Sequence, residues 1–152
     1  AVNSDFPIFD DIQKYVVDRG KAAGAGDQIG TVLYNRGMYN AMLITEAART
    51  AQAIAGKSNI SQADMIKGFE ALEMTEEKMA ALGLPGFGPS FSVSCENHGG
   101  DGMVAVAQWD AGAGKWSIVS DFQASDMSVI QPLIDADSGA FASENNLSPN
   151  CN

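Results

Sequence analysis

The one histidine of this chain lies three residues after one of its two cysteines, in the run Cys95-Glu96-Asn97-His98. A thiolate and an imidazole at this spacing can supply two ligands to zinc, and Cys151 with an acid could complete the four that a closed zinc site requires. The same pair could serve nucleophilic catalysis, but the chain has no Gly-x-Ser-x-Gly turn. We interpret the run as a loop after a strand, and we predict no catalytic residue, no metal site and no cofactor.

A second candidate for chemistry is the run Tyr34-Asn35-Arg36-Gly37-Met38-Tyr39-Asn40. Aromatic rings with a few polar groups are what a small-molecule pocket requires, and an arginine can hold a carboxylate through two parallel hydrogen bonds. The alternative is that Tyr39 packs against the rest of the fold while Arg36 lies on the surface. We take Tyr39, Tyr34 and Arg36 as the candidate ligand-binding residues.

The two cysteines leave the redox setting open. In an exported protein Cys95 and Cys151 could close one disulfide over a long loop, whereas in the cytosol they would be two unrelated thiols. No signal peptide opens the sequence, which predicts a cytosolic chain, a processed one or a piece of something larger.

Length and charge narrow the class of protein. The 152 residues suffice for one domain with a core, and 45% of them are hydrophobic. The formal net charge of −10 disfavours nucleic acid and anionic lipid as partners. No run of eighteen apolar residues is present, so the sequence predicts no membrane span.

Periodicity predicts the elements that must position these residues. After a linker at residues 1–5, we expect helices at about 6–19 (with Asp5 as N-cap), 34–55, 61–72 and 75–83, strands at 91–96, 103–110 and 115–122, and a final helix at about 127–145. Ser61 to Asp64 forms a predicted capping box, and Thr75 caps the fourth helix. Residues 110–114 predict a hairpin connection.

The inward face of the long helix is open to two interpretations. One places Met38, Met42, Thr45 or Glu46, and Arg49 inward, and the other places Leu43, Ala47, Thr50 and Ile54 there. Helices followed by an antiparallel hairpin favour the α+β class for an isolated domain. Three strands among five helices make a lopsided sheet, as though other strands were supplied elsewhere.

Two stretches carry a family resemblance. The first runs from Ile29 to Leu43 and continues with Glu46-Ala47-Ala48-Arg49-Thr50-Ala51. The second consists of Val93 to Gly100 and the short runs Gln108-Trp109-Asp110, Gly114-Lys115-Trp116 and Ser120-Asp121-Phe122. In order and spacing they resemble the helix and the C-terminal hairpin of the branched-chain amino-acid type of periplasmic solute-binding protein, which serves ABC importers.

The resemblance implies an α/β fold, the C-terminal part of a two-lobed, periplasmic-binding-protein-like type I architecture. Residues 1–152 would be one fragment, with about 6–85 the helical part of one lobe, about 90–122 a hairpin and hinge region, and 123–152 a helix and tail. Among these residues Tyr39 best matches a cleft-lining tyrosine of the family.

The function implied by the resemblance is that of an extracytoplasmic solute-binding subunit, periplasmic or extracellular, and not an enzyme. It would bind an amino acid, an amide or an aromatic acid in the interlobe cleft. Its partners would be that ligand, the membrane subunits of an ABC permease and the missing N-terminal part of the same protein, with no nucleic acid. A ligand-sensing regulator or receptor domain of the same fold is the alternative.

Overall fold

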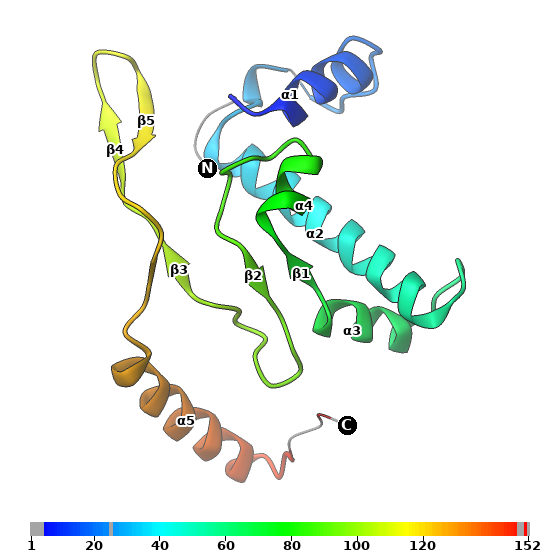
Figure 1. Cartoon of the computed structure of the whole chain (residues 1–152), viewed down its shortest axis with the longest axis vertical. Helices are drawn as coiled ribbons and strands as arrows, with labels where there is room; N and C mark the ends of the chain where they lie inside the picture. The colour runs from blue at the N-terminus through cyan, green and yellow to red at the C-terminus, as the bar shows by residue number, and fades with distance from the viewer. Residues whose placement is uncertain (1–4, 25, 149–150, 152) are drawn as a thin grey trace.

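The computed structural model describes residues 5–24, 26–148 and 151, so the predicted linker at residues 1–5 lies outside it except for Asp5. We divide the chain into a packed region, residues 6–93, and a C-terminal arm, residues 103–147 (Figure 1). The elements of the packed region are α1 (Pro7–Ile12), the π-helix η1 (Gln13–Val17), the 3-10 helix η2 (Gly26–Gln28), α2 (Val32–Ala55), α3 (Gln62–Glu70), β1 (Glu73–Met74), α4 (Glu76–Ala81) and β2 (Phe91–Ser92). Those of the C-terminal arm are β3 (Met103–Val104), β4 (Ala107–Asp110), β5 (Lys115–Ile118), β6 (Gln123–Ala124) and α5 (Met127–Glu144).

The predicted helices are confirmed, and most begin at a side-chain cap. The hydroxyl of Thr31 accepts from the backbone N–H of Tyr34 at the start of α2. Ser61 and Asp64 form the predicted capping box of α3, and Thr75 caps α4. The prediction of Asp5 as the first N-cap is wrong, because Phe6 holds that position with an extended backbone and Pro7 supplies the first helical φ angle.

The core of the packed region lies where α1, α4 and the turn after α4 meet the first half of α2. Its buried members are Phe9, Leu72, Met74, Met79, Leu84 and Phe87. On its other side α2 packs closely on α3, because Gly68 of α3 lies against the backbone of Ala47 and the side chain of Ala51. This arrangement resolves the two interpretations of α2. Both faces are used, so that Glu46 and Ala47 are both buried, whereas the predicted inward residue Ile54 is 53% exposed.

The strands are shorter than predicted and form three separate two-stranded antiparallel ribbons among the described residues. The pairs are β1 with β2, β3 with β6, and β4 with β5. The 91–96 strand shrinks to two residues because a turn at 94–97 interrupts it, and its partner β1 was not predicted. The hairpin at 110–114 is confirmed: the Asp110 carboxylate accepts from the N–H groups of Gly112 and Ala113 at 2.8 and 3.0 Å, and Gly114 adopts a φ of 63°.

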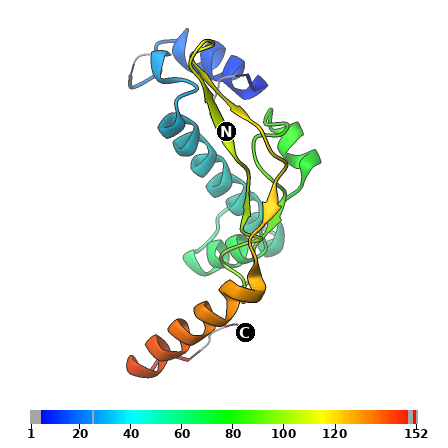
Figure 2. The ribbon, with the colours of Figure 1, turned by 90° about the vertical axis from the view of Figure 1, so that its left-hand side faces the viewer.

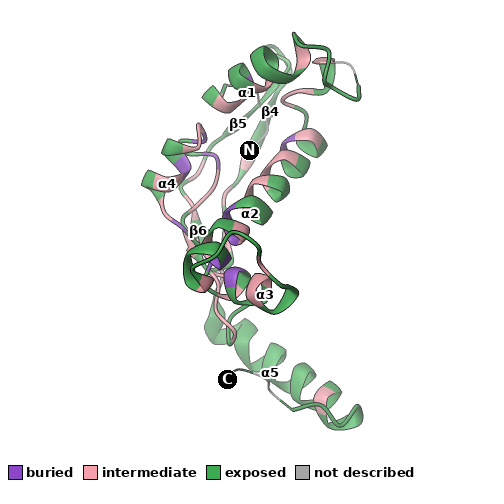
Figure 3. Ribbon diagram, turned by 90° about the vertical axis from the view of Figure 1, so that its right-hand side faces the viewer, coloured by how far each residue is buried: buried purple, intermediate pink, exposed green. Residues whose placement is uncertain are grey.

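The C-terminal arm lacks a core of its own. In Figure 2 it runs as an extended ribbon and α5 points away from the packed region, and Figure 3 shows the arm almost wholly exposed. Helix α5 has no buried residue over its 18 positions and includes Pro132. Within the part of the chain that the structure describes, we find no helix that is both long and apolar enough to cross a membrane.

A disulfide joins the two parts. Cys95, just beyond the packed region, is bonded to Cys151 across a sequence separation of 56 residues, which confirms the pairing left open above. The bond therefore closes a loop that contains the whole C-terminal arm.

Candidate functional site

A groove of about 650 Å³ with a mainly apolar lining lies beside Tyr39, and we call it the Tyr39 groove. Tyr39 and Leu43 of α2 form one wall, and Ile66 and Phe69 of α3 form the next. The third wall is the segment from Pro89 to Met103. It is held there by the β1–β2 pairing and by a hydrogen bond from the Val93 N–H to the Leu72 carbonyl at 2.9 Å.

Tyr39 is the predicted ligand-binding residue that reaches this groove. Its ring stacks on Phe87 with a centroid distance of 5.1 Å and an interplanar angle of 27°. Its hydroxyl lies 3.9 Å from the Met79 sulfur, and burial raises the pKa of the Tyr39 phenol. The phenol is therefore neutral at physiological pH and can act as a hydrogen-bond donor at the edge of an apolar surface.

The other two predicted residues lie elsewhere on α2. Tyr34 packs toward the core, with its ring centroid 6.3 Å from that of Phe9, and Arg36 is exposed. Neither belongs to the lining of the Tyr39 groove. Tyr34 lies five positions before Tyr39 and is therefore turned about 140° from it around the helix axis. Arg36 lies three positions before Tyr39, nearly one helical turn nearer the start of α2, and is turned about 60° from it. Their assignment as ligand contacts stays a prediction.

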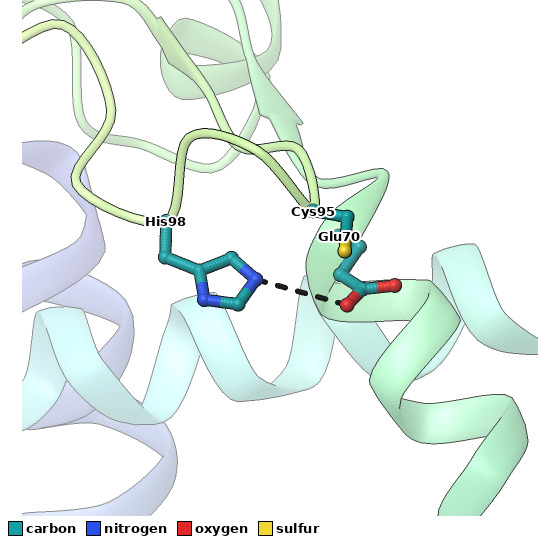
Figure 4. Close-up of side chains that lie close together, drawn as sticks. All are labelled: Glu70, Cys95 and His98. Atoms are coloured by element: carbon teal, nitrogen blue, oxygen red, sulfur yellow. Dashed lines mark ion pairs between the residues drawn. The ribbon is translucent and has the colours of Figure 1, made fainter. Parts of the chain in front are cut away.

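A cluster of three possible ligands lies at one end of the groove, formed by Glu70, Cys95 and His98 (Figure 4). One ligand atom of each lies within 4.8 Å of those of the other two. The His98 Nε2 atom is 3.7 Å from a carboxylate oxygen of Glu70. We call this set the Cys95 cluster. Because the Cys95 sulfur is bonded to Cys151, it is neither a nucleophile nor a thiolate ligand in this oxidised form.

Sequence reasoning found Cys95 and His98 but missed Glu70. The carboxylate comes from the last residue of α3, twenty-five positions before Cys95. The β1–β2 pairing and the adjacent Val93–Leu72 hydrogen bond bring the two segments together, and β1 is a two-residue strand with no alternation that a sequence pattern could reveal. The one available signal was that Glu70 ends an amphipathic helix.

A second groove, with a larger volume of about 880 Å³, lies across the 96–103 loop from the first. Its far wall is α5, through Met127, Ile130 and Ile134. Residues 98–103 line both grooves. The loop that carries His98 is thus a partition between an apolar surface of the packed region and one of the C-terminal arm.

No protein-family model matches the sequence, and the search of curated proteins found no match. Among solved structures, one described as an ABC transporter permease from the Pseudomonas fluorescens group is similar, with 34% sequence identity and a TM-score of 0.88. The match covers 100% of this chain and 37% of that one. The two share a fold over all of this chain, which spans little more than a third of the length of the permease structure.

This neighbour overturns the predicted identity and function. The resemblance pointed to a solute-binding subunit, or to a sensor of the same fold, whereas the matching protein is described as a permease. More than a third of the residues in the quoted stretches are glycine, alanine or aromatic, types that occur in close helix packing and in hairpins of many proteins. Such stretches were too general to separate one transport component from another. The comparison supports the coarser conclusion that this chain is related to ABC transporters.

Proposed function

We propose that this chain is part of a longer subunit of an ABC transport system, and that its C-terminal arm docks the chain onto the rest of that subunit. The relation to an ABC transporter permease of greater length supports the first half of the proposal. The second half rests on one observation, the apolar surface that the arm leaves exposed.

The apolar side chains of the arm gather on the hairpin and on α5. The large exposed ones are Val104, Val106, Trp109, Trp116, Ile118, Val119, Met127, Val129, Ile130, Leu133, Ile134, Phe141 and, just after α5, Leu147. Large exposed apolar surfaces mark interaction sites in soluble proteins, and a lone two-stranded hairpin is marginally stable in water. We propose that further strands of the subunit extend these ribbons into the sheet of a two-lobed α/β fold. Residues 6–85 would then belong to one lobe, 90–122 to the hinge, and 123–152 to the closing helix and tail.

The disulfide supports a location outside the cytoplasm for this part of the subunit. Such bonds persist in the periplasm and the extracellular space and are rare where glutathione and thioredoxin keep thiols reduced. We also propose that the chain has no catalytic role, since bonding to Cys151 removes the strongest nucleophile near His98.

Docking is tested by producing the 152-residue chain and the remainder of its subunit as two polypeptides. We expect a stoichiometric complex in size-exclusion chromatography, with slowed amide exchange in β4, β5 and α5. Trp109→Asp or Leu133→Asp should break the complex, because each would bury a charge. Ile54→Asp is the matched control, since Ile54 is similarly exposed but lies on α2. Absence of a complex, or equal damage by the control, would contradict the proposal.

We propose the transported solute as a second partner, reached through Tyr39 in the assembled subunit. The supporting observation is the aromatic and aliphatic lining of the Tyr39 groove, which suits an aromatic or apolar small molecule. A ligand that binds the folded state raises the melting temperature, so a thermal-shift screen of aromatic acids, amides and amino acids identifies candidates. Tyr39→Ala should abolish the ligand-induced rise in melting temperature. Tyr15→Ala, which removes an exposed ring on η1, should leave that rise unchanged.

A further inference from the structure

We propose that reduction of the Cys95–Cys151 disulfide converts the Cys95 cluster into a zinc site with four protein ligands. These are the two thiolates, an imidazole nitrogen of His98 and a carboxylate oxygen of Glu70. The earlier expectation of no metal site then applies to the oxidised chain alone. This inference is independent of the docking proposed above.

The spacing of the ligand atoms fits a tetrahedral site. With zinc–sulfur distances of about 2.3 Å and zinc–nitrogen or zinc–oxygen distances of about 2.0–2.2 Å, neighbouring ligands lie roughly 3.3–3.8 Å apart. The ligand atoms of Glu70, Cys95 and His98 are all within 4.8 Å of one another. The Cys151 sulfur is bonded to that of Cys95, so opening the disulfide frees a second thiol beside the cluster. The distances between these ligand atoms must shorten by at most about 1 Å to reach the tetrahedral values.

The backbone already holds three of the four ligands in place. Hydrogen bonds from the Ser94 N–H to the Asn97 carbonyl and from the Asn97 N–H to the Ser94 hydroxyl, both 3.1 Å, close a turn that presents Cys95 and His98 on the same side. A third bond, from the Asn97 side-chain amide to the Gly100 carbonyl at 3.2 Å, fixes the exit of that turn. Two residues beyond Glu70, the Leu72 carbonyl is bonded to the Val93 N–H. Zinc binding therefore needs little ordering of the segments that carry these three ligands. Bringing Cys151 to the metal does require the 56-residue loop to close again.

The reductant is a dithiol. The dithiol becomes a cyclic disulfide and transfers two electrons and two protons, so that the bond between the two chain sulfurs opens to two thiols. Zinc then displaces both thiol protons to solvent, because a coordinating thiol is deprotonated. In the oxidised chain only His98 and Glu70 remain as ligands, and two ligands do not make a closed site. Soft thiolates favour zinc over magnesium or calcium, so the switch is selective.

The test is a zinc titration of the whole chain in competition with a chromophoric chelator, before and after reduction by a phosphine, which does not itself offer thiols. We expect one equivalent of zinc to bind the reduced chain at least about 100-fold more tightly than the oxidised chain, a difference of about 2.7 kcal/mol. Cobalt(II) should give thiolate-to-metal charge-transfer bands only after reduction. Equal zinc affinity in the two redox states, or a cobalt spectrum without those bands, would overturn the proposal.

Amino-acid substitutions distinguish the zinc ligands from nearby residues that do not coordinate the metal. His98→Gln and Glu70→Gln should each weaken zinc binding to the reduced chain by at least the roughly 10–100-fold that loss of an outer-shell partner costs. Glu96→Gln is the matched control, an exposed acid in the same turn that lies outside the cluster. Cys151→Ser removes the disulfide and one ligand, so it should bind zinc without reductant but more weakly than the reduced parent chain. Far-UV circular dichroism verifies folding, and equal weakening by Glu96→Gln would count against the assignment.

Discussion

The packed region and the C-terminal arm use similar apolar residues with opposite results. All eight buried hydrophobic side chains among the described residues lie between Phe9 and Phe87. The arm has two tryptophans, Phe141 and a series of aliphatic residues, yet none of its side chains is buried. Burial differs because the two parts differ in packing partners. The helices of the packed region cross and cover one another, whereas the ribbons and α5 extend away from each other.

Local hydrogen bonds nevertheless define the elements of both parts equally well. Asp126 caps α5 by accepting from the backbone N–H of Ser128 at 3.1 Å, as Ser61 and Asp64 cap α3. Asp110 closes the turn of the β4–β5 hairpin. Secondary structure thus needs only neighbours in sequence, whereas burial needs a second surface. The arm has secondary structure but no second surface that would bury its apolar side chains.

The largest effect should come from opening the disulfide. A bond that closes a 56-residue loop contributes roughly 4 kcal/mol in the chain-entropy model. Because that loop contains the whole arm and none of the packed region, reduction should speed amide hydrogen exchange in β4, β5 and α5 while leaving α2 and α3 unchanged. Exchange measured by mass spectrometry checks this. Equal acceleration in α2 would show that the two parts are not independent.

Two glycine substitutions should act in opposite directions within the packed region. At Gly68 an added Cβ would clash with the Ala47 carbonyl oxygen, so Gly68→Ala must push α3 away from α2 and cost about 3 kcal/mol. A Cβ added at Gly37 of α2 would have no heavy atom within 4 Å apart from its own helix backbone and chain neighbours. Gly37→Ala should therefore raise the free energy of unfolding by up to about 1 kcal/mol through helix propensity. Urea unfolding of both variants measures the difference. If the Gly68→Ala and Gly37→Ala variants had similar free energies of unfolding, α3 would not pack on α2 this closely.

The sequence predicted well what depends on neighbours along the chain. The helix starts at Ser61 and Thr75, the break at Gly83 and the hairpin at Asp110 all follow from single residues with a defined turn or cap preference. The inward face of α2 could not be chosen, because the helix is covered on two sides. Adjacent Glu46 and Ala47, about 100° apart on the helix, are therefore both buried.

The candidate site was predicted in part, for the same reason. The Cys95-x-x-His98 spacing is local and was visible. The position of Glu70 depends on the pairing of Glu73 with Ser92, a contact between two-residue strands. Tyr34, Arg36 and Tyr39 are close in sequence, but only Tyr39 lines the groove, so proximity along the chain did not predict a shared pocket.

A smaller effect should appear at the start of α3. The hydrogen bond from Lys57, followed by those from the Ser61 N–H and hydroxyl, lowers the pKa of Asp64 below the ordinary aspartate range. Because the folded-state pKa is lower than the unfolded one, the stabilisation is complete above the ordinary range and is lost as the pH falls through the folded pKa. Carbon-detected NMR titration should find this depressed pKa, and Lys57→Met should raise it.

The matching cap substitution tests the hydroxyl separately. Ser61→Ala should cost about 1 kcal/mol of unfolding free energy, and Ser61→Thr, which keeps the oxygen, should cost less. An Asp64 carboxyl that titrates in the ordinary range in the parent chain would contradict the capping box. At Asp126, where Ser128 lowers the pKa of the carboxyl, the same titration compares the cap of the exposed helix.

The smallest effect is expected at Leu133, and it bears most directly on the contrast between the two parts. Its side chain is 64% exposed on α5, so Leu133→Ala removes little packing and exchanges one good helix former for another. The free energy of unfolding of the 152-residue chain should change by less than about 0.5 kcal/mol. Leu84→Ala, at a fully buried leucine of the core, should cost about 2–5 kcal/mol in the same urea titration. In the longer subunit the cost at Leu133 should rise toward that of Leu84, because docking would place α5 against a second surface. A Leu133→Ala cost that stays negligible there would mean that α5 remains in solvent, and the docking surface would then have to lie on the hairpin alone.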